Sequence, residues 1–329
     1  MLKNKDRPVT SQIESTRLRS KIIGLHHVEL VVSDIKRSET FYRPTGVEMS
    51  VVSAENLGAH GKDRFLLKAP NGCLALRQSE AVTRLNPLPV VGPGVTHACF
   101  QAPVQASLYQ KLVAEGAQPV STGSPPIDLN GQGVCYAYAR DPDGTMFEVE
   151  ELEVPKFKGP ISLAHIALVS PDIDRAVSFY SQLLGVGPYG RANKVLGPRF
   201  DEVTGLASVR IRAAWFNTGN MVLEFWEFIN PETPKTVVER SAEEAGYHQF
   251  TLETSDLDGE VQRLSALGLL SNAEIQFGSE LNKIDMQDPD GNRFSLVETH
   301  PDALIRVEHF EPMPWLPAPA WPGNAALKP

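Results

Sequence analysis

The chain contains one long internal repeat, and this repeat limits the fold to two copies of the same structural unit. Residues 27–42 read His-Val-Glu-Leu-Val-Val-Ser-Asp-Ile-Lys-Arg-Ser-Glu-Thr-Phe-Tyr, and residues 165–180 read His-Ile-Ala-Leu-Val-Ser-Pro-Asp-Ile-Asp-Arg-Ala-Val-Ser-Phe-Tyr. An Asp-Pro-Asp-Gly turn follows in each copy, at residues 141–144 and 288–291. A repeat of this length indicates a tandem duplication whose period is the half chain.

Each half divides again into two similar modules. An apolar strand with a histidine opens the half, and Ser and Asp residues then supply the N-cap of a helix that ends in Phe-Tyr. Short apolar runs separated by turns follow this helix. The same pattern restarts near Thr96 and near Tyr247. The sequence therefore predicts an α+β fold of four βαβββ modules, arranged as two tandem domains.

The expected boundaries follow the composition of the connecting segments. We place the first domain at residues 24–152 and the second at 162–300, because the segment between them is charged and contains proline. Residues 1–23 are polar and should form an N-terminal arm. Residues 301–329 are rich in proline, which fixes φ and removes hydrogen-bond donors, so we expect an extended tail.

Charge and cysteine content restrict the partners. The net charge of -9 and the absence of a basic run argue against nucleic acid or an anionic membrane surface, and small molecules are the expected ligands. No run of eighteen apolar residues occurs, so we predict no membrane span. The three cysteines, which form no Cys-x-x-Cys pair, suit a reducing cytoplasm.

The repeated openings and the two Asp-Pro-Asp-Gly turns together resemble the vicinal oxygen chelate superfamily, over roughly residues 24–300. This superfamily includes glyoxalases, extradiol ring-cleaving dioxygenases, methylmalonyl epimerase-type isomerases and fosfomycin or bleomycin resistance proteins. The resemblance implies paired modules that curl into a cup around one divalent metal. The metal would present open positions to a substrate with adjacent oxygens. The fold alone does not identify the reaction.

The resemblance also implies the ligand positions, which lie on the first strand and on a later strand of each module. The matching residues are His27, Ala75, His97 and Glu148 in the first half, and His165, Glu224, His248 and Ser295 in the second. Our first choice of metal site is His27, His97 and Glu148, because two histidines and one carboxylate form the facial triad of non-haem Fe(II) sites. The second choice is His165, Glu224 and His248. Fe(II) is favoured, with Mn(II), Zn(II) or Ni(II) as alternatives.

Alternate residues of a strand share a face, which predicts what else each cup presents. The first cup should present Glu29, Arg77, Tyr136, Tyr138 and Glu150, and the second Ala167, Val169, Val222, Trp226, Phe250 and Val297. Tyr138 and Glu29 are the candidate catalytic residues. Substrate contacts are expected from Arg77, Tyr136, Trp226 and Phe250. The plainer alternatives are an ion pair between Glu29 and Arg77 and a packing role for Tyr138.

The favoured function is an extradiol-type dioxygenase that acts on a small oxygenated, aromatic substrate and consumes O₂. The main alternative is a glyoxalase-like or epimerase-like isomerase or lyase, in which a metal polarises a carbonyl and a carboxylate moves a proton. A third possibility is a metal-free protein that binds a small molecule. A homodimer is a reasonable expectation.

Overall fold

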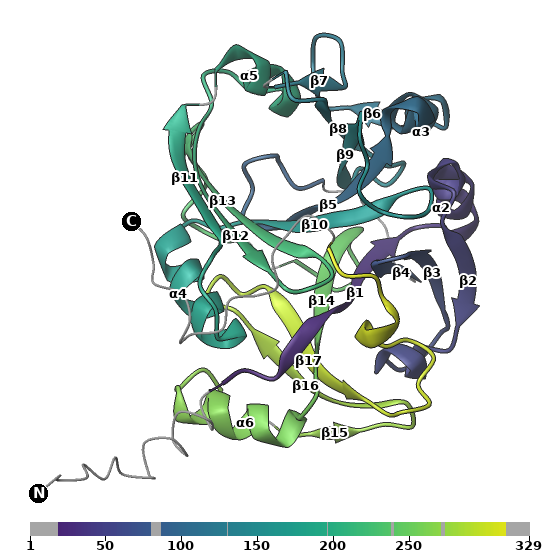
Figure 1. Cartoon of the computed structure of the whole chain (residues 1–329), viewed down its shortest axis with the longest axis vertical. Coiled ribbons are helices and arrows are strands. Elements are labelled where there is room, and N and C mark those ends of the chain that lie inside the picture. Colours follow the sequence, from purple (N-terminus) through teal and green to yellow (C-terminus); the bar gives the residue numbers. More distant parts are fainter. Residues whose placement is uncertain are drawn as a thin grey trace, which may run out of the picture.

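The computed structural model describes the chain from residue 19 to residue 313 with short gaps. The described ranges are 19–79, 87–129, 131–195, 197–237, 240–270 and 274–313. Most of the expected N-terminal arm and the tail from residue 314 onward lie outside them. Within these ranges the strands form two large sheets, and the helices are few and short (Figure 1). No helix among the described residues has the length and apolar character needed to span a bilayer.

The predicted α+β fold of four βαβββ modules is confirmed. Module 1 comprises β1 (Ile22–Val32), α2 (Ile35–Tyr42), η1 (Arg43–Thr45), β2 (Glu48–Val52), η2 (Ala54–Leu57), β3 (Arg64–Ala69) and β4 (Gly72–Gln78). Module 2 comprises β5 (Gly94–Pro103), η3 (Val104–Ala106), α3 (Leu108–Ala114), β6 (Gln118–Pro119), β7 (Ile127–Asp128), β8 (Val134–Arg140) and β9 (Met146–Leu152).

The second half repeats this order of strands, with a longer helix within module 3. Module 3 comprises β10 (Ser162–Val169), α4 (Ile173–Leu184), β11 (Gly190–Val195), α5 (Pro198–Thr204), β12 (Arg210–Asn217) and β13 (Val222–Asn230). Module 4 comprises β14 (Gly246–Thr254), α6 (Leu257–Ala266), β15 (Gln276–Phe277), β16 (Leu281–Gln287) and β17 (Arg293–Thr299), and η4 (Val307–His309) follows it. This longer helix is α5, which lies between β11 and β12, where module 1 has the short η2.

The modules pair across the two halves of the chain. In every module the first strand lies at one edge and pairs in parallel with the last strand. These edges then join antiparallel: β1 pairs with β14, and β5 pairs with β10. Modules 1 and 4 therefore form one sheet, here called sheet A, and modules 2 and 3 form the other, sheet B. Joining the edges in this way pairs backbone groups that would otherwise be left open.

The repeated sequence motifs hold the modules of each half together. The hydroxyl of Tyr42, at the end of α2, donates to Asp141 in the first Asp-Pro-Asp-Gly turn at 3.1 Å. Tyr180, at the end of α4, donates to Asp288 in the second turn at 2.9 Å. Gly144 and Gly291 both have a φ above +80°, which explains the glycine in these turns. The duplicated motif thus joins helix and turn within a half, whereas the sheets join the halves.

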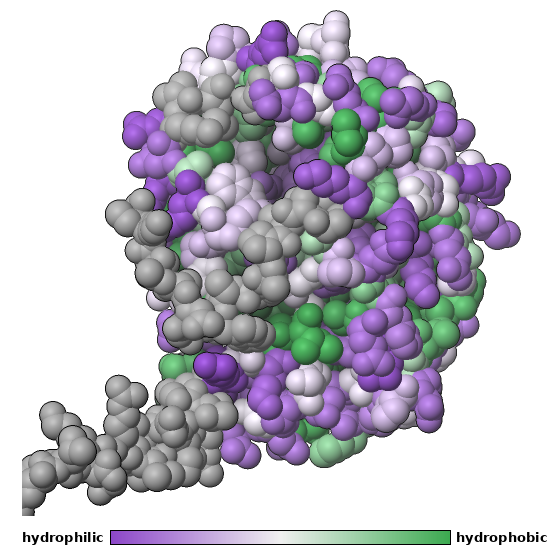
Figure 2. Space-filling model, viewed as in Figure 1, coloured by the Kyte–Doolittle hydropathy of each residue, from purple (hydrophilic) through white to green (hydrophobic). Residues whose placement is uncertain are grey.

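A C-terminal segment fills the concave side of sheet A. Residues 303–313, here called the strap, pack Ile305, Val307 and Phe310 against a cluster that includes Leu66 and Ala75 of β3 and β4. Figure 1 shows this yellow segment crossing near β1. Figure 2 shows hydrophobic side chains on the same part of the surface. Burial of these side chains leaves the strap firmly attached to sheet A.

The buried side chain of His26 ties the strap to β1. His26 Nε2 lies 3.0 Å from the carbonyl oxygen of Ile305, and because a carbonyl only accepts, the nitrogen donates. Burial lowers the pKa of His26 from 6.5 to about 4, although the hydrogen bond to Ile305 acts in the opposite direction. The folded protein therefore keeps this imidazole neutral at pH values where the unfolded chain already protonates it.

We expect this histidine to make the protein sensitive to mild acid. Between pH 6.5 and pH 4 the unfolded state binds the proton more strongly, so stability falls as the pH falls. From pH 7 to pH 5 the loss from this group is about 2 kcal/mol. His26→Gln keeps a donor for Ile305 and removes the titration. Urea unfolding at both pH values should show a correspondingly smaller loss in the variant, and equal losses would contradict the prediction.

Candidate metal centre

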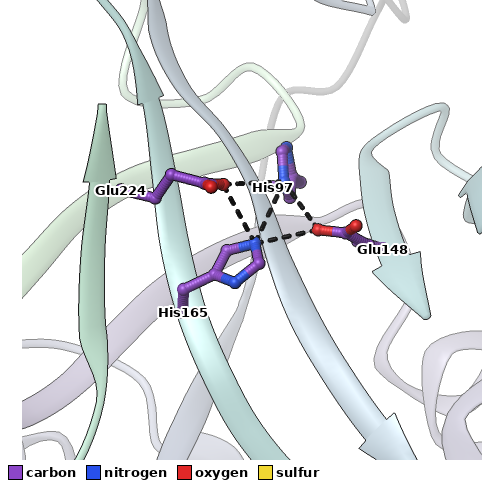
Figure 3. A group of neighbouring side chains, drawn as sticks. All are labelled: His97, Glu148, His165 and Glu224. Carbon is purple, nitrogen blue, oxygen red and sulfur yellow. Dashed lines mark hydrogen bonds and ion pairs between the residues drawn. The ribbon is translucent and has the colours of Figure 1, made fainter. Parts of the chain in front are cut away.

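Four potential metal ligands from four neighbouring strands of sheet B converge at the junction of modules 2 and 3. His97 lies on β5, Glu148 on β9, His165 on β10 and Glu224 on β13, and Figure 3 shows their side chains pointing toward one another. One ligand atom from each lies within 4.8 Å of all the others. The four side chains are no more than about a tenth exposed.

The strand register explains why these residues meet. In the parallel pairing of β5 with β9, Glu148 lies beside Cys99, two residues after His97. In the pairing of β10 with β13, Glu224 lies beside Ala167, two residues after His165. Residues two apart on a strand share a face, so each glutamate projects on the same side as its histidine. Modules 2 and 3 thus contribute one histidine and one glutamate each.

The distances within the cluster are those of atoms that share a cation. His165 Nε2 lies 2.8 Å from Glu148 Oε2 and 3.2 Å from Glu224 Oε2. His97 Nε2 lies 3.3 Å from Glu148 Oε2 and 4.0 Å from Glu224 Oε2, and the two Nε2 atoms are 3.4 Å apart. Ligand atoms at about 2.1 Å from an octahedral ion lie about 3 Å apart. Small shifts would place all four atoms around one ion.

The chemistry of the donors also fits a divalent transition metal. Two imidazole nitrogens and two carboxylates suit Zn²⁺, Fe²⁺, Mn²⁺ or Ni²⁺. Glu224 Oε2 is buried and has no hydrogen-bond partner among the described residues, which leaves a buried acceptor for a cation. Trp215 Nε1 donates to the other oxygen of Glu224 at 2.5 Å, and Thr96 Oγ1 lies 3.0 Å from His97 Nδ1. Such outer contacts orient metal ligands.

The side chains in and beside the cluster strongly shift one another's pKa values. Burial alone would raise the pKa of Glu148, but hydrogen bonds from His165 and His97 outweigh it and lower that pKa to about 2. Burial would lower the pKa of His165, whereas Glu224 and Glu148 raise it to about 10. Burial, and next the charge of Glu148, raise the pKa of Glu150 to about 7. The excess of carboxylates attracts positive charge to this point.

A cavity of about 780 Å³ opens in front of the cluster. Its lining includes His165, Glu148 and Glu224 together with Tyr136 and Tyr138. The ring of Tyr138 lies 5.0 Å from the ring of His97, centroid to centroid. This volume is typical of sites for small molecules. Three of the residues predicted as catalytic or substrate-contacting, Tyr136, Tyr138 and Trp226, therefore line the same cavity as the predicted ligands Glu148, His165 and Glu224.

The structure does not bring together either predicted triad as it was grouped. From the first choice, His97 and Glu148 lie in the cluster but His27 lies on sheet A. From the second choice, His165 and Glu224 lie in the cluster but His248 does not. The grouping assumed that modules pair within each half, whereas the sheets pair module 2 with module 3. The observed cluster combines one pair of residues from each triad.

His248 is also displaced by one position in its strand. Gly94 and Gly246 begin β5 and β14 with the same φ of 133°, and His97 follows the first glycine by three residues. The residue three after Gly246 is Gln249, which pairs with Glu29 as His97 pairs with Ala167, so Gln249 takes the ligand position and His248 does not. Its Nε2 lies 2.6 Å from the carbonyl oxygen of Glu244. Counting from the glycine would have identified Gln249.

The same register places Phe250 in the core. Its ring is fully buried and stacks on Phe294 at 5.4 Å, so it does not contact the cavity. Glu29 and Arg77 lie on sheet A and form the ion pair that was the plainer alternative, at 3.2 Å, and Arg64 lies 3.4 Å from the same carboxylate. Neither residue lines the cavity in front of the metal cluster.

The corresponding positions on sheet A lack the carboxylate donors that the cluster on sheet B has. The corresponding positions hold His27, Ala75, Gln249 and Ser295, so neither of its glutamate positions carries a carboxylate. Gln249 instead donates to the hydroxyl of Ser295, and the strap packs against Ala75. The four-ligand arrangement therefore occurs on sheet B, and its counterpart on sheet A is filled by protein.

Helix α5 supplies cavity residues that the sequence did not reveal. It crosses from module 3 to module 2, where Thr122 N donates to the Glu202 carbonyl at 2.7 Å and Arg199 donates to the Asp128 carbonyl at 2.7 Å. Figure 1 shows α5 beside β7 at the top of the molecule. Phe200 and Val203 of this helix line the cavity. Tyr189 and Met313 were missed as well, because only the folded chain brings these segments to the cluster.

Comparison with known proteins supports the fold and the family. The model of the Glyoxalase/Bleomycin resistance protein/Dioxygenase superfamily matches residues 24–149 and 162–296. An ethylmalonyl-CoA/methylmalonyl-CoA epimerase of Cereibacter sphaeroides is 26% identical over 140 residues, which are 39% of this chain and 97% of the epimerase.

Two solved structures share the arrangement of the modules. Glyoxalase I from Zea mays superimposes with a TM-score of 0.58 and 18% identity, covering 84% of this chain and 92% of that protein. A putative dioxygenase from Bacillus subtilis gives a TM-score of 0.56 and 13% identity, covering 86% and 87%. At these identities the likeness concerns the fold. On the family match over both halves, the chain belongs to the Glyoxalase/Bleomycin resistance protein/Dioxygenase superfamily, the vicinal oxygen chelate proteins that its motifs resemble.

Proposed function

We propose that this protein is a metal-dependent isomerase or lyase that moves a proton on a carbon atom beside a carbonyl group of a small oxygenated molecule. The convergence of two histidines and two glutamates carries this proposal. Two histidines and one carboxylate suffice to hold an ion with positions left for two adjacent substrate oxygens. The second glutamate of the cluster then lies beside the bound substrate, where its carboxylate can accept a proton. This additional base favours proton transfer over the dioxygenase.

A bound divalent metal would supply Lewis acidity that polarises the substrate carbonyl. His97, His165 and Glu148 would hold it, since Glu148 Oε2 lies closer to both histidine Nε2 atoms, at 3.3 and 2.8 Å, than Glu224 Oε2 does. Glu224 is held less tightly, with its Oε2 at 3.2 and 4.0 Å from the two Nε2 atoms. Trp215 fixes Glu224 Oε1 and leaves Oε2 to accept the substrate proton.

Tyr138 would assist by holding a substrate oxygen. Burial, and next the charges of Glu148 and Glu224, raise the pKa of Tyr138 well above 10, so the phenol keeps its proton at neutral pH and can donate it in a hydrogen bond. The relative from Cereibacter sphaeroides is named an epimerase, and epimerisation is itself a proton transfer at carbon. This name supports the same class of chemistry for the present chain.

One observation favours a dioxygenase as the second candidate. If Glu224 is left out, the remaining donors of the cluster are His97, His165 and Glu148. They form the two-histidine, one-carboxylate set of non-haem Fe(II) enzymes. If Trp215 held Glu224 away from the ion, a position for O₂ would remain. The two candidates differ in their need for O₂ and in the role of Glu224.

Proton exchange in the absence of O₂ tests the proposal. The probe is the hydroxyketone 2-hydroxy-1-phenylethanone, which carries adjacent oxygens and has exchangeable protons on its hydroxyl-bearing carbon, beside the carbonyl. In D₂O under nitrogen, the metal-loaded protein should catalyse exchange of these protons for deuterium. Proton NMR measures the rate at which their signal disappears. Glu224→Gln should slow exchange by at least about 100-fold, the usual contribution of a general base. Glu227→Gln, at a buried glutamate on the same strand that pairs with Arg212 instead, should exchange at nearly the wild-type rate.

The same proteins distinguish the second candidate. Oxygen uptake with catechol by the Fe(II)-loaded protein, retained in Glu224→Gln and accompanied by no proton exchange, would replace the isomerase with a dioxygenase. Elemental analysis of each sample shows whether the metal remains bound, so that loss of exchange is assigned to the missing base and not to an empty site.

A further inference from the structure

The cavity in front of the cluster is apolar beyond its metal-facing end. Phe200 and Trp226 stack with their ring planes 18° apart and form one wall. The other apolar lining residues include Leu129, Val203, Ile211, Trp215, Val222 and Met313. Helix α5 and the end of the strap both contribute to this surface, although they come from different modules. A substrate that reaches the cluster must therefore place its body against aromatic and aliphatic side chains.

The charged side chains that line the cavity are mostly acidic. Its described lining contains four glutamates, namely Glu148, Glu150, Glu153 and Glu224. Lys156, which is exposed at the rim, is the one lysine or arginine among the described lining residues. Binding of phosphate groups in proteins relies on arginine, lysine or helix N-termini that offset the negative charge. With a divalent ion offset by Glu148 and Glu224, the carboxylates of Glu150 and Glu153 would still repel a polyanionic substrate, and Lys156 is the one side-chain cation of the described lining that would oppose them.

Resting on the proposed function, we infer that the substrate has a compact, uncharged and apolar body attached to its adjacent oxygens, and that it carries no phosphate-bearing group such as coenzyme A. The apolar wall would contact the body of the substrate, and the acidic lining would repel the phosphate groups of coenzyme A. The substrate class therefore differs from the coenzyme A esters in the name of the epimerase relative.

Binding of the neutral fluorescent ketone prodan, with coenzyme A as competitor, tests this inference. Prodan should bind with a blue-shifted emission, and millimolar coenzyme A should not displace it. Trp226→Ala should weaken prodan binding by roughly tenfold or more, since an aromatic contact is lost from the wall. The matched control is Phe277→Ala, an aromatic residue that is 81% exposed on β15 and distant in the fold from sheet B, with no expected effect.

A second cavity variant is needed because Trp226 is buried and its replacement by alanine could unfold the protein. Ala192 is a half-buried residue of β11 that lines the cavity, and Ala192→Phe adds volume there without removing a core side chain. It should also weaken prodan binding. Equal prodan affinity in wild type and both cavity variants would overturn the inference, and so would displacement of prodan by coenzyme A.

The test separates this inference from the proposed reaction. His97→Ala removes a metal ligand but no part of the apolar wall, so it should lose proton exchange and keep prodan binding. Prodan binding with no exchange in any metal-loaded sample would refute the reaction alone. Exchange on a coenzyme A ester, with prodan bound no more tightly by the wild type than by Trp226→Ala, would refute the inference about the substrate alone.

Discussion

His165→Ala is expected to lose its bound metal and to slow proton exchange by at least about 1000-fold, which corresponds to ~4 kcal/mol of lost transition-state stabilisation. His165 Nε2 is within 3.5 Å of the ligand atoms of both Glu148 and Glu224 and of His97, so it contacts every other member of the cluster. Its removal leaves two buried carboxylates with one histidine between them. Metal per chain would be measured by elemental analysis, and exchange by NMR.

The chain provides a matched control at the equivalent strand position. His27→Ala removes a buried histidine from β1, the first strand of module 1, whose cup on sheet A lacks carboxylates at the ligand positions. Metal content and exchange should remain near the wild-type values. Retention of metal in His165→Ala together with its loss in His27→Ala would move the metal to sheet A and refute the assignment.

Glu260→Ala is expected to destabilise the protein by about 3–5 kcal/mol, because it leaves a guanidinium buried without its counter-charge. Glu260 on α6 lies 2.6 Å from Arg263, and both side chains are almost fully buried. Arg263 also donates to the carbonyl oxygens of Gln182 and Leu183 at the end of α4, at 2.7 and 2.5 Å. A positive charge at a helix C-terminus is itself favourable. This pair therefore joins α6 of module 4 to α4 of module 3.

Urea unfolding of three variants would test this account. Asp258→Ala, at an exposed acidic residue of the same helix, should change stability by no more than about 0.5 kcal/mol. The double variant Glu260→Leu with Arg263→Met replaces the pair with apolar groups and should recover part of the loss. A double variant less stable than Glu260→Ala would show that the hydrogen bonds from Arg263 to α4 matter more than the unpaired charge.

The sequence was sufficient to predict the modules and to name the four residues of the cluster as candidate ligands. Helix starts were visible because Asp34 and Asp172 cap α2 and α4, each accepting a hydrogen bond from the backbone three residues later. His97, Glu148, His165 and Glu224 were all candidates before the structure was considered. Their types and their spacing within a module are local properties, and local properties are recorded in the sequence.

The grouping of these ligands could not be read in the same way. Whether β5 joins β10 or the first strand of its own half depends on which free edges meet in the folded chain, and the repeat is equally compatible with both. The register of β14 was a second source of error, because His248 and Gln249 are adjacent and the strand pairing puts Gln249 at the position that His97 takes in β5. The apolar side chains that α5 adds to the cavity reach it through a contact between modules 3 and 2. The periodicity of a sequence does not predict such a contact.

Pairing across the halves has a consequence for how this chain can be divided. A cut in the connection between β9 and β10 would produce two fragments, each with one histidine and one glutamate of the centre. Two ligands hold a metal weakly, so neither fragment should function alone, whereas a mixture of the two could reconstitute the site. The two halves share a sequence pattern, but neither contains all four residues of the cluster. The cluster forms only where β5 of one half pairs with β10 of the other.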